Sequence, residues 1–417
     1  MNFKNIKYCK RCLYPSNHPL NLIFDDKGVC SGCLVHDEKY KINWNEKLNK
    51  LKKIVRTYKS KNFNYDCIVP VSGGKDSFYI LDIVKNKLRL NPLIVSYNKH
   101  YNTETGIKNL AYLKTVFDCD SVVLNVNPLK VKKITKKTFF EFGSIYWHIL
   151  AGQSVLPVRK AVELKIPLII WGAHQGIDQV GMFSHHNDVE MTRKYRKNHD
   201  LMGYEAEDLE NFNLTKSDLE EYYYPSNDKI SEIGVRGIYL NNYFFWDSKK
   251  QHEQMIKLYN YSTRKQFRTI DNYNDVDCFH YSSLHDYIKY LKYGYSKIND
   301  HLTRDIRLKK ISRNESLNIL KKYVDLKPKI AEIKLFSKWI GVSTSSVQMN
   351  VDKQRNLLIW KKDKSNWKLR YPITKLKIKN KLMKQKYSFN NNPLKKKLFK
   401  EDEYILYHKG FKPLLDL

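Results

Sequence analysis

The six residues 72–77 read Ser-Gly-Gly-Lys-Asp-Ser, and they constrain this chain more than any other feature. They follow an apolar run, residues 67–71, and precede a stretch compatible with a helix, residues 78–87. A strand, a glycine turn and a helix start form an anion site, because free backbone N–H groups and the helix dipole both point at the turn. Two adjacent glycines let the backbone approach a phosphate without a Cβ clash. Lys75 adds a positive charge, and Asp76 could hold Mg²⁺.

The spacing differs from the Walker P-loop, which needs four residues between its first glycine and the Gly-Lys pair. It resembles the PP-loop of the ATP-pyrophosphatase superfamily. The resemblance implies that ATP is cleaved between its α and β phosphates, with transfer of AMP to a substrate and release of pyrophosphate. The alternative is a chance Gly-Gly turn, and the flanking strand and helix favour the functional interpretation. The expected ATP- and pyrophosphate-binding residues here are Ser72, Gly73, Gly74, Lys75, Asp76 and Ser77.

From Asp66 onward the pattern alternates between strand and helix. The expected strands are residues 66–71, 92–97, 121–125 and 167–171. The expected helices between them are residues 78–88, 105–117 and 149–164. Continuous apolar strands separated by helices predict a parallel sheet covered on both faces. We therefore expect an α/β fold with a doubly wound parallel sheet, PP-loop or HUP-like, and ligands in such folds bind at the carboxyl ends of the strands.

The fourth expected strand ends in a glycine-rich segment, residues 171–178. PP-loop enzymes often carry a glycine and an acid there, closing over the nucleotide, and Gly172, His174 and Asp178 resemble that element. The resemblance adds Gly172 to the nucleotide-binding set. The expected catalytic residues are Lys75, Asp76, Asp178 and His174. The alternative interpretation of this segment is a simple glycine-rich loop.

Four of the cysteines form the pattern C-x₂-C-x₁₇-C-x₂-C near the N-terminus: Cys9, Cys12, Cys30 and Cys33. Paired C-x₂-C knuckles at this separation are typical of tetrahedral Cys₄ zinc. Two disulfides are the alternative, but nothing in the sequence suggests export, and the cytosol keeps thiols reduced. Iron–sulfur ligation is a further alternative. We favour a structural Zn²⁺.

A chain of 417 residues is expected to hold two or three domains. The expected units are a zinc-binding module (1–40), the α/β domain (41–260), a helical substrate or partner region (261–350) and a basic tail (351–417). The longest apolar run, residues 166–171, is far shorter than a membrane span. The first residues lack the apolar core of a signal peptide, so we expect a cytoplasmic protein.

The formal net charge of +32 invites a nucleic-acid interpretation. Lys, Asn and Ile are abundant throughout the chain, which indicates a general compositional bias. The charge is densest in residues 370–400, which contain 11 Lys or Arg and no acid. That segment could contact RNA, an acidic membrane surface or an acidic partner, or it could be a solvated basic face. We do not expect nucleic acid to be the main partner.

Further motifs follow the cysteine pairs and the hexapeptide in a fixed order. They are Gly-Met-Phe-Ser (181–184), Val-Glu-Met-Thr (189–192), His-Asp-Leu (199–201), Gly-Ile-Tyr-Leu (237–240) and an Asp-His and Arg-Asp-Ile-Arg pair (300–307). This ordered set is similar to the N-acetyl sugar amidotransferase family, whose members serve surface polysaccharide synthesis and flagellin glycosylation, including pseudaminic and legionaminic acids. The resemblance covers residues 5–350. Ala173 departs from it, because the family usually has an acid there.

The resemblance implies conversion of a sugar's acetamido group to an acetamidino group. The amide oxygen attacks the α-phosphate of ATP, and ammonia then displaces AMP from the adenylated imidate. The glycine loop and Lys75 would stabilise charge on the departing pyrophosphate, assisted by Mg²⁺ through Asp76. His174, His199 and His301 are the candidates for a general base.

The substrate residues implied by the resemblance come from the later motifs. They are Glu190, Arg193, His199, Asp200, His301, Arg304 and Arg307. Guanidinium groups bind carboxylate and diphosphate bidentately, so the arginines suit a sugar acid or a nucleotide sugar. Surface ion pairs are the alternative for each arginine.

The chain has no sign of its own ammonia source. A triad glutaminase needs a cysteine on a sharp glycine-flanked turn, and Cys67, Cys119 and Cys278 lack that setting. Residue 2 is Asn, which excludes an N-terminal nucleophile. We therefore expect a separate glutaminase subunit and a cyclase-like ammonia-channelling subunit, as the family resemblance also implies.

Two other functions compete with this prediction. A tRNA-modifying PP-loop enzyme, either a thiolase or a lysidine-type ligase, would use the positive charge to bind phosphates. Thiolases that carry sulfur on the protein usually need a reactive cysteine pair, and the remaining cysteines are scattered. A non-catalytic ATP-binding scaffold is the third possibility, and the intact Lys75 and Asp76 argue against it.

Overall fold

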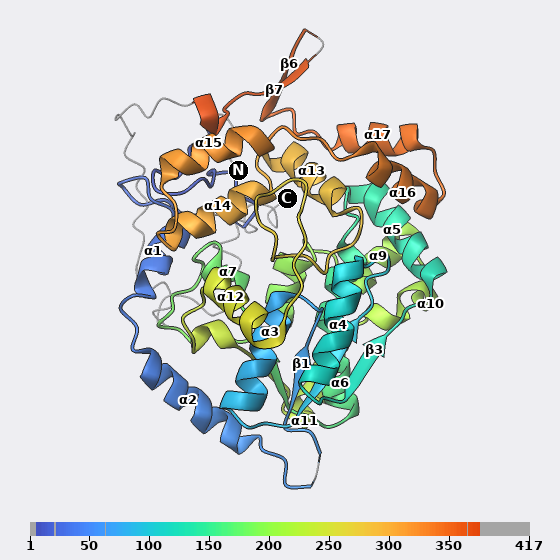
Figure 1. The fold of residues 1–417 in the computed structure, drawn as a ribbon. Helices are drawn as coiled ribbons and strands as arrows, with labels where there is room; N and C mark the ends of the chain where they lie inside the picture. The colour runs from blue at the N-terminus through green and yellow to red at the C-terminus, as the bar shows by residue number, and fades with distance from the viewer. Residues whose placement is uncertain (1–5, 21, 63, 365, 376–417) are drawn as a thin grey trace.

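A parallel five-stranded sheet forms the centre of the molecule. The computed structural model describes residues 6–375, apart from 21, 63 and 365 (Figure 1). The strands are β1 (Cys67–Pro70), β2 (Pro92–Tyr97), β3 (Ser121–Leu124), β4 (Leu168–Trp171) and β5 (Arg236–Tyr239). Their order is β3-β2-β1-β4-β5, and each neighbouring pair is parallel. The four predicted strands are confirmed, and β5 adds an edge strand that the pattern analysis did not assign.

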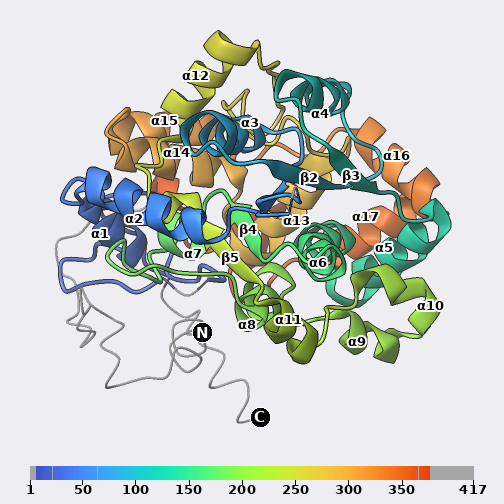
Figure 2. The ribbon, with the colours of Figure 1, turned by 90° about the horizontal axis from the view of Figure 1, so that it is seen from below.

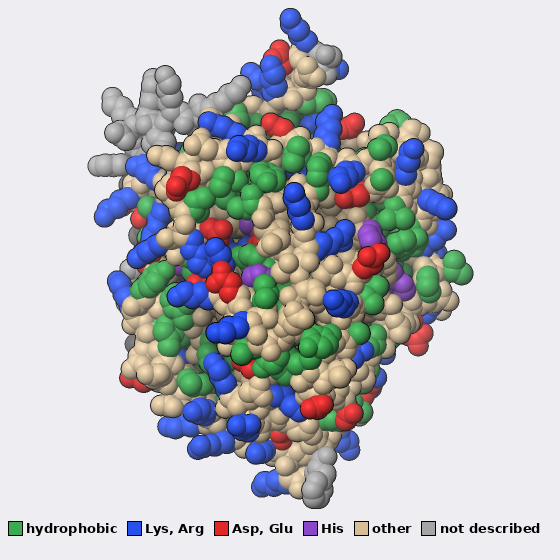
Figure 3. Space-filling view, in the orientation of Figure 1, with side chains coloured by type: hydrophobic (Ala, Val, Ile, Leu, Met, Phe, Trp, Pro, Cys, Tyr) green, Lys and Arg blue, Asp and Glu red, His purple; other side chains and the backbone are tan. Residues whose placement is uncertain are grey.

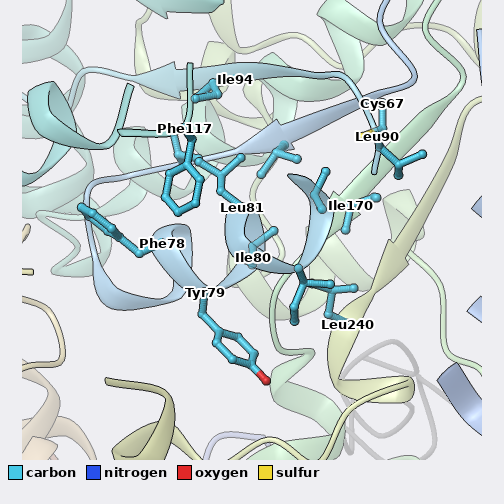
Figure 4. Close-up of a cluster of buried hydrophobic side chains, with 14 of the residues drawn as sticks. Cys67, Phe78, Tyr79, Ile80, Leu81, Leu90, Ile94, Phe117, Ile170 and Leu240 are labelled. Carbon is cyan, nitrogen blue, oxygen red and sulfur yellow. The ribbon is translucent and has the colours of Figure 1, made fainter. Parts of the chain in front are cut away.

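Alternate residues of the strands enter two separate hydrophobic cores, as the two-residue period of a strand requires. Cys67 and Val69 of β1 enter the core that contains α3 (Lys75–Leu81), whereas Ile68 enters the core that contains α6 (Trp147–Glu163). Figure 2 shows α3 and α4 (Glu104–Val116) on one side of the sheet and α6 on the other. Figure 4 shows the first core, with Phe78 and Leu81 beside residues of the strands. The predicted doubly wound sheet is confirmed.

The remaining helices of the first 260 residues surround this sheet. They are α1 (Ser31–Glu38), α2 (Trp44–Thr57), α5 (Pro128–Phe142), α7 (Gln175–Asp178), α8 (Arg193–Tyr195), α9 (Ala206–Leu209), α10 (Lys216–Leu219), α11 (Asn227–Ile233) and α12 (Ser248–Tyr259). The predicted helix after the hexapeptide begins earlier than expected, at Lys75, and continues beyond α3 as a π-helix, Asp82–Lys87. Short helices fill the long connection between β4 and β5, where the sequence shows motifs but little periodicity.

The C-terminal region is helical, as predicted, and lies across the top of the molecule in Figure 1. Its helices are α13 (Ser282–Tyr293), α14 (Lys297–Arg307), α15 (Arg313–Tyr323), α16 (Ile330–Ile340) and α17 (Thr344–Lys353). A hairpin of β6 (Trp360–Asp363) and β7 (Asn366–Leu369) follows. The segment expected to be a basic tail from residue 351 therefore begins with the end of α17 and this hairpin. Its residues from 376 onward lie outside the described part of the chain.

The N-terminal module packs against elements that are distant in sequence. The Ser31 hydroxyl donates to the Val180 carbonyl (2.6 Å), and the Tyr14 hydroxyl donates to Asp300 on α14 (3.0 Å). The module's apolar residues share a buried cluster with residues 177–195 and Tyr295. It is therefore held between α14 and the loop after α7. Among the helices of the described residues, none is both long and apolar enough to cross a membrane.

Candidate active site

The hexapeptide forms the turn between β1 and α3 at the carboxyl edge of the sheet. Gly73 has a φ of +83°, and a Cβ there would lie 2.8 Å from the Gly106 carbonyl oxygen, so the turn requires glycine. The Ser72 N–H donates to the Ser77 hydroxyl (3.0 Å), which closes the turn. Gly74 is the N-cap of α3 in an extended conformation. The Ser77 N–H donates to the Gly74 carbonyl at 3.0 Å, and the first N–H groups of a helix otherwise lack an acceptor inside it.

A polar cavity of about 190 Å³ lies beside this turn. Two buried lysines line it: Lys75, paired with Asp76, and Lys99, paired with Asp277. Asp275 also lines the polar cavity, and its carboxylate pairs with Lys297 at 3.0 Å. Burial raises the pKa of Asp275, but Lys297 outweighs this and keeps it below its ordinary value. The polar cavity thus places two ammonium groups and three carboxylates around one space, a donor set that suits a phosphate chain and a divalent cation.

An apolar pocket of about 160 Å³ adjoins the polar cavity. The two spaces share Ser72 and Gln153 in their walls. The rest of the lining of the apolar pocket is apolar or aromatic. Pro70, Val71, Val95, Tyr97 and Trp171 belong to the strands or follow them directly, and Leu156 and Pro157 belong to α6. The chain proceeds from β1 to β2 and β3 on one side, and then crosses to β4 and β5 on the other side of β1. The apolar pocket lies at this change of direction. Open α/β sheets bind ligands at this switch point, and the combined shape suits a planar base joined to phosphates.

The structure separates the sequence-predicted nucleotide residues into two places. Ser72, Gly74, Lys75 and Asp76 line the polar cavity. Gly73 and Ser77 shape the turn without lining either space. Gly172 lies elsewhere: a Cβ there would approach Ile80 and Trp246 on the α3 side of the sheet. Ala173, at the position where the family has an acid, packs against the same core. A nucleotide-binding role for Gly172 stays a prediction.

Asp178 and His174 belong to a different part of the molecule. Asp178 forms an ion pair with the buried Lys39 and lines a small cavity of about 80 Å³ together with Arg304 and Arg307. Burial alone would raise the pKa of Asp178, but the ion pair with Lys39 outweighs this and lowers the pKa to about 2. His174 caps α7, where its Nδ1 accepts the Gly176 N–H at 3.1 Å. The structure places neither residue in the polar cavity, and their catalytic roles stay predictions.

Three of the predicted substrate residues lie near β5 and α8. Glu190 accepts three hydrogen bonds from Arg236, the shortest at 2.6 Å. Arg193 pairs with Glu205 at 2.7 Å, and the His199 ring stacks on Tyr195 with ring centres 4.0 Å apart. Asp200, a fourth predicted residue, ends the π-helix that follows α8 (Arg196–Asp200). The structure does not bring these residues to the polar cavity.

The other predicted substrate residues lie on α14. Arg304 donates to Asp271 at 3.0 Å, and His301 hydrogen bonds with Thr269 at 2.6 Å. Burial lowers the pKa of His301 to about 4, so the imidazole is neutral near pH 7. Arg307 points instead at the N-terminal cysteines. Its Nε donates to the Cys33 sulfur at 3.4 Å and its Nη2 to the Cys30 sulfur at 3.6 Å.

The four N-terminal cysteines converge, as their spacing predicts. All four are buried, and their sulfur atoms lie within 4.8 Å of one another. The Cys9–Cys33 and Cys12–Cys30 sulfur pairs are 4.0 and 3.6 Å apart. Zn–S bonds of about 2.3 Å in a tetrahedron place sulfurs about 3.8 Å apart, so this cluster has the size of a Cys₄ metal site. Gly32 makes room for Arg307 beside the sulfurs, since a Cβ there would clash with its Nη2 at 2.3 Å.

Sequence reasoning missed several residues of the polar cavity. Lys99 lies two residues after the end of β2, and the rule that ligands bind at the carboxyl ends of strands was a sufficient signal for it. Gln153, Asp275 and Asp277 have no such signal. Asp275 and Asp277 reach the hexapeptide because a bridge between Asn102 and Phe279 brings the 271–281 loop to the sheet edge.

Comparison with known proteins gives a family match for the C-terminal region. Residues 261–374 match the family model described as the C-terminal domain of WbpG-like LPS biosynthesis proteins. The match includes Asp275 and Asp277, which line the polar cavity. It supports the resemblance that the ordered motifs carry, and it extends beyond residue 350 to include the β6–β7 hairpin.

One curated relative is an uncharacterized protein, MJ1599, from Methanocaldococcus jannaschii. It is 30% identical over 117 residues, a stretch that spans 28% of this chain and 42% of the relative, which is less than half of that protein.

Similar solved structures include the NH₃-dependent NAD synthetase of Campylobacter jejuni, with 10% identity and a TM-score of 0.28 over 46% of this chain and 92% of that chain. The NMN synthetase of Francisella tularensis has 14% identity and a TM-score of 0.26 over 52% of this chain and 94% of that chain.

Proposed function

From the similarity of residues 261–374 to the WbpG-like C-terminal domain, we propose that this chain is an ATP-dependent, ligase-type amidotransferase of surface polysaccharide synthesis. It activates the acetamido group of an N-acetyl sugar with AMP and replaces the amide oxygen with ammonia, giving an acetamidino sugar. One observation carries the proposal. The glycine turn, two buried lysines and an adjoining apolar pocket share one site at the switch point of the sheet, and the matched domain supplies two carboxylates of its wall.

The described residues support each part of this chemistry. The apolar pocket takes the base of ATP, and the hexapeptide turn takes the phosphates. An amide oxygen is a poor leaving group until it is bonded to phosphorus, and its attack on the α-phosphate releases pyrophosphate. Lys75 and Lys99 stabilise the charge that grows on the departing phosphates, in a buried site where charge interactions are strong. Mg²⁺, held by Asp76 and a carboxylate of the 275–277 loop, would add to that neutralisation.

The cysteine cluster supports a structural rather than a catalytic metal. Four thiolates complete a tetrahedral shell and leave no position for a substrate. Four thiolates with Zn²⁺ carry a net negative charge, and Arg307 offsets it by donating to two sulfurs. We propose that Zn²⁺ holds the N-terminal module against α14 and the loop after α7.

The remaining thiols support an external ammonia source. Burial raises the pKa of Cys67, Cys119 and Cys278, that of Cys278 to about 12. A glutaminase nucleophile needs a thiolate, and these thiols are protonated near pH 7. We propose that a separate glutaminase subunit supplies ammonia through a cyclase-like channelling subunit, and that the complex works in the cytoplasm.

The direct test incubates the protein with ATP, Mg²⁺, an ammonium salt and a panel of UDP- and CMP-linked N-acetyl sugars and free N-acetyl sugar acids. Mass spectrometry should show one sugar whose amide oxygen has been replaced by NH, together with AMP and pyrophosphate. Lys75→Ala is expected to abolish the product without changing the circular dichroism spectrum. Lys87→Ala, an exposed lysine of the same helical run, is the matched control. Product formation by Lys75→Ala would remove the hexapeptide from the mechanism.

A tRNA-modifying enzyme is the alternative. Figure 3 shows Lys and Arg side chains spread over the whole of the displayed face, without one continuous patch. A phosphate-tracking surface is expected to concentrate its cations. Salt-sensitive tRNA binding in the absence of any reaction with an N-acetyl sugar would favour this alternative.

A further inference from the structure

A further cavity, of about 480 Å³, lies inside the C-terminal region. Its walls come from the loop of residues 264–269 and from α13, α14 and α16. We call it the C-terminal cavity. It shares Asp275 with the polar cavity, so one carboxylate stands in the walls of both spaces. Its volume lies within the range of small-molecule sites, and none of the substrate residues expected from sequence lines it.

Arg268 is the most informative residue of the C-terminal cavity. Its side chain is 2% exposed, and its Nε donates to Asp286 at 2.6 Å. Its Nη1 and Nη2 are buried and have no hydrogen-bond partner among the described residues. Asp286 does not satisfy them: its Oδ2 accepts from the Arg268 Nε, and its Oδ1 accepts the Lys297 N–H at 2.6 Å. A buried guanidinium with two unused nitrogens is costly unless a ligand completes it, and its planar fork matches a carboxylate or a phosphate.

The loop that carries Arg268 adds further positive charge. Arg264 and Lys265 are exposed and form no ion pair with any described residue, and the same holds for Lys329, the N-cap of α16. The Lys329 Nζ lies 5.1 Å from the centre of the Phe267 ring, which is 37% exposed. The cavity therefore combines free cations with an accessible aromatic face.

The side of the C-terminal cavity formed by α13 and α16 can hydrogen bond with a neutral polar group. Glu332 has one buried carboxyl oxygen without a partner among the described residues. Burial raises the pKa of Glu332, and a hydrogen bond from Ser283 and the charges of Lys329, Arg264 and Arg268 partly oppose this. Ser282, Ser283 and His280 line the same side. Sugar hydroxyl and acetamido groups suit such a wall.

We infer that the C-terminal cavity binds the acceptor, an N-acetyl sugar that carries an anionic group, either a carboxylate or a nucleoside diphosphate. Arg268 grips the anion, with Arg264 and Lys265 at the entrance. The acetamido end points to the Asp275 wall, beyond which lie Lys75 and the hexapeptide. This inference rests on the proposed function, which supplies the identity of the reaction. The binding of the acceptor can be measured without ATP.

The test is calorimetric titration of the full chain, without ATP, with three probes: N-acetylneuraminic acid, UDP-N-acetylglucosamine and neutral N-acetylglucosamine. We expect at least one anionic probe to bind, and the identity of that probe distinguishes a carboxylate ligand from a diphosphate ligand. Arg268→Lys keeps the charge beside Asp286 but loses the fork, and should weaken binding about tenfold or more. The double variant Arg264→Gln/Lys265→Gln changes only exposed side chains and should weaken binding by a similar factor. Lys53→Gln, an exposed lysine on α2, should not change it.

Several outcomes would overturn the inference: neither anionic probe binds, ATP displaces the bound probe, or the loop variants bind it as tightly as the wild type. Loss of tRNA binding in the loop variants, with sugar binding unchanged, would also overturn it. A different set of results would contradict the proposed function. In that case the loop variants weaken the binding of anionic sugars, but no sugar elicits pyrophosphate release. If release occurs and the loop variants leave its KM for the sugar unchanged, the proposed function stands and the C-terminal cavity is not the acceptor site.

Discussion

Lys99 illustrates how a single residue joins two regions of the chain. Its Nζ donates to the Asp277 backbone carbonyl at 3.1 Å and forms an ion pair with the Asp277 carboxylate. Both side chains are at least nine-tenths buried. A buried pair of this kind contributes little net stability, but removing one partner leaves an uncompensated charge. Lys99 thus positions the 271–281 loop and also offers an ammonium group to the polar cavity.

A double-mutant comparison separates these two roles. Lys99→Met should lower the free energy of unfolding by about 3–5 kcal/mol, because the Asp277 carboxylate is left buried and unpaired. Adding Asp277→Asn should recover much of that stability, but it should not recover pyrophosphate release, since the cavity still lacks one cation. Chemical denaturation and a pyrophosphate assay measure the two effects. Lys368→Met, which breaks an exposed pair with Asp363, is the control and should change stability by less than about 1 kcal/mol.

Recovery of pyrophosphate release in the double variant would show that Lys99 acts only by positioning the loop.

At the residue scale, sequence identified Lys75 and Asp76 because their setting is local: strand, turn and helix are adjacent in the chain. Asp277 could not be identified, because its partner Lys99 is 178 residues away in sequence. Arg268 could not be identified, because its setting depends on a cavity that several helices and loops build together.

At the scale of elements, the N-terminal module depends on its four cysteines. Hydrogen bonds join the module to α14 and to the loop after α7. They come from residues next to the cysteines, including Leu13, Tyr14 and Ser31. A short module with little core of its own needs such a staple. Metal loss is therefore expected to loosen these contacts.

Cys33→Ser should abolish the binding of one zinc per chain and lower the thermal midpoint, and a strong chelator should have the same effect on the wild type. Elemental analysis and thermal denaturation measure these changes. Cys119→Ser is the matched control, since Cys119 lies outside the cluster. Full zinc content in Cys33→Ser, with unchanged stability, would contradict a Cys₄ zinc site.

A buried histidine on α6 predicts part of the pH dependence of stability. Burial lowers the pKa of His148 to about 3, and its Nδ1 hydrogen bonds with the Tyr97 hydroxyl at 3.0 Å. An unfolded histidine titrates near pH 6.5. Between these two values the unfolded state binds more protons, so stability falls as the pH falls.

His148→Gln should remove this contribution, which is about 1.4 kcal/mol per pH unit inside that window. Denaturation midpoints measured from pH 6.5 to pH 4.5 should decline less steeply in the variant. His186→Gln, at an exposed histidine, should keep the wild-type slope. An identical slope in His148→Gln would mean that His148 is not held neutral in the folded protein.

The elements themselves were largely predictable. The four predicted strands are long apolar runs between helical patterns, and they all appear. β5 (Arg236–Tyr239) was missed because its sequence, Arg-Gly-Ile-Tyr, is not a continuous apolar run and is equally compatible with a motif in a loop. Within the helical region expected over residues 261–350, Gly341 ends α16 with a φ of +68°, and α17 begins at Thr344.

At the scale of the whole molecule, the candidate site is assembled from three distant regions. The hexapeptide supplies the turn, β2 and α6 supply Lys99 and Gln153, and the C-terminal region supplies the 275–278 wall. Topology predicted the first contribution and the edge of the sheet at which it lies. The third depends on how the C-terminal region docks, which periodicity and local motifs do not encode.

All residues assigned to the site lie within residues 6–375, so removing residues 376–417 should leave ATP-dependent pyrophosphate release and the thermal midpoint unchanged. The deleted segment includes nine of the eleven Lys and Arg residues counted in 370–400, and only Arg370 and Lys375 of that set remain. If RNA binds this protein through that charge, the truncated chain should lose RNA binding alone. Loss of pyrophosphate release in the truncated chain would place part of the active site in the deleted segment.

The central claim is that the amide oxygen of the acceptor attacks the α-phosphate of ATP. An N-acetyl sugar whose acetamide oxygen carries the heavy isotope ¹⁸O tests this directly, with ATP, Mg²⁺ and an ammonium salt. We predict that mass spectrometry finds the label in the phosphate of AMP and finds none in pyrophosphate. Label in inorganic phosphate, accompanied by ADP, would mean that the γ-phosphate is attacked and would contradict the account.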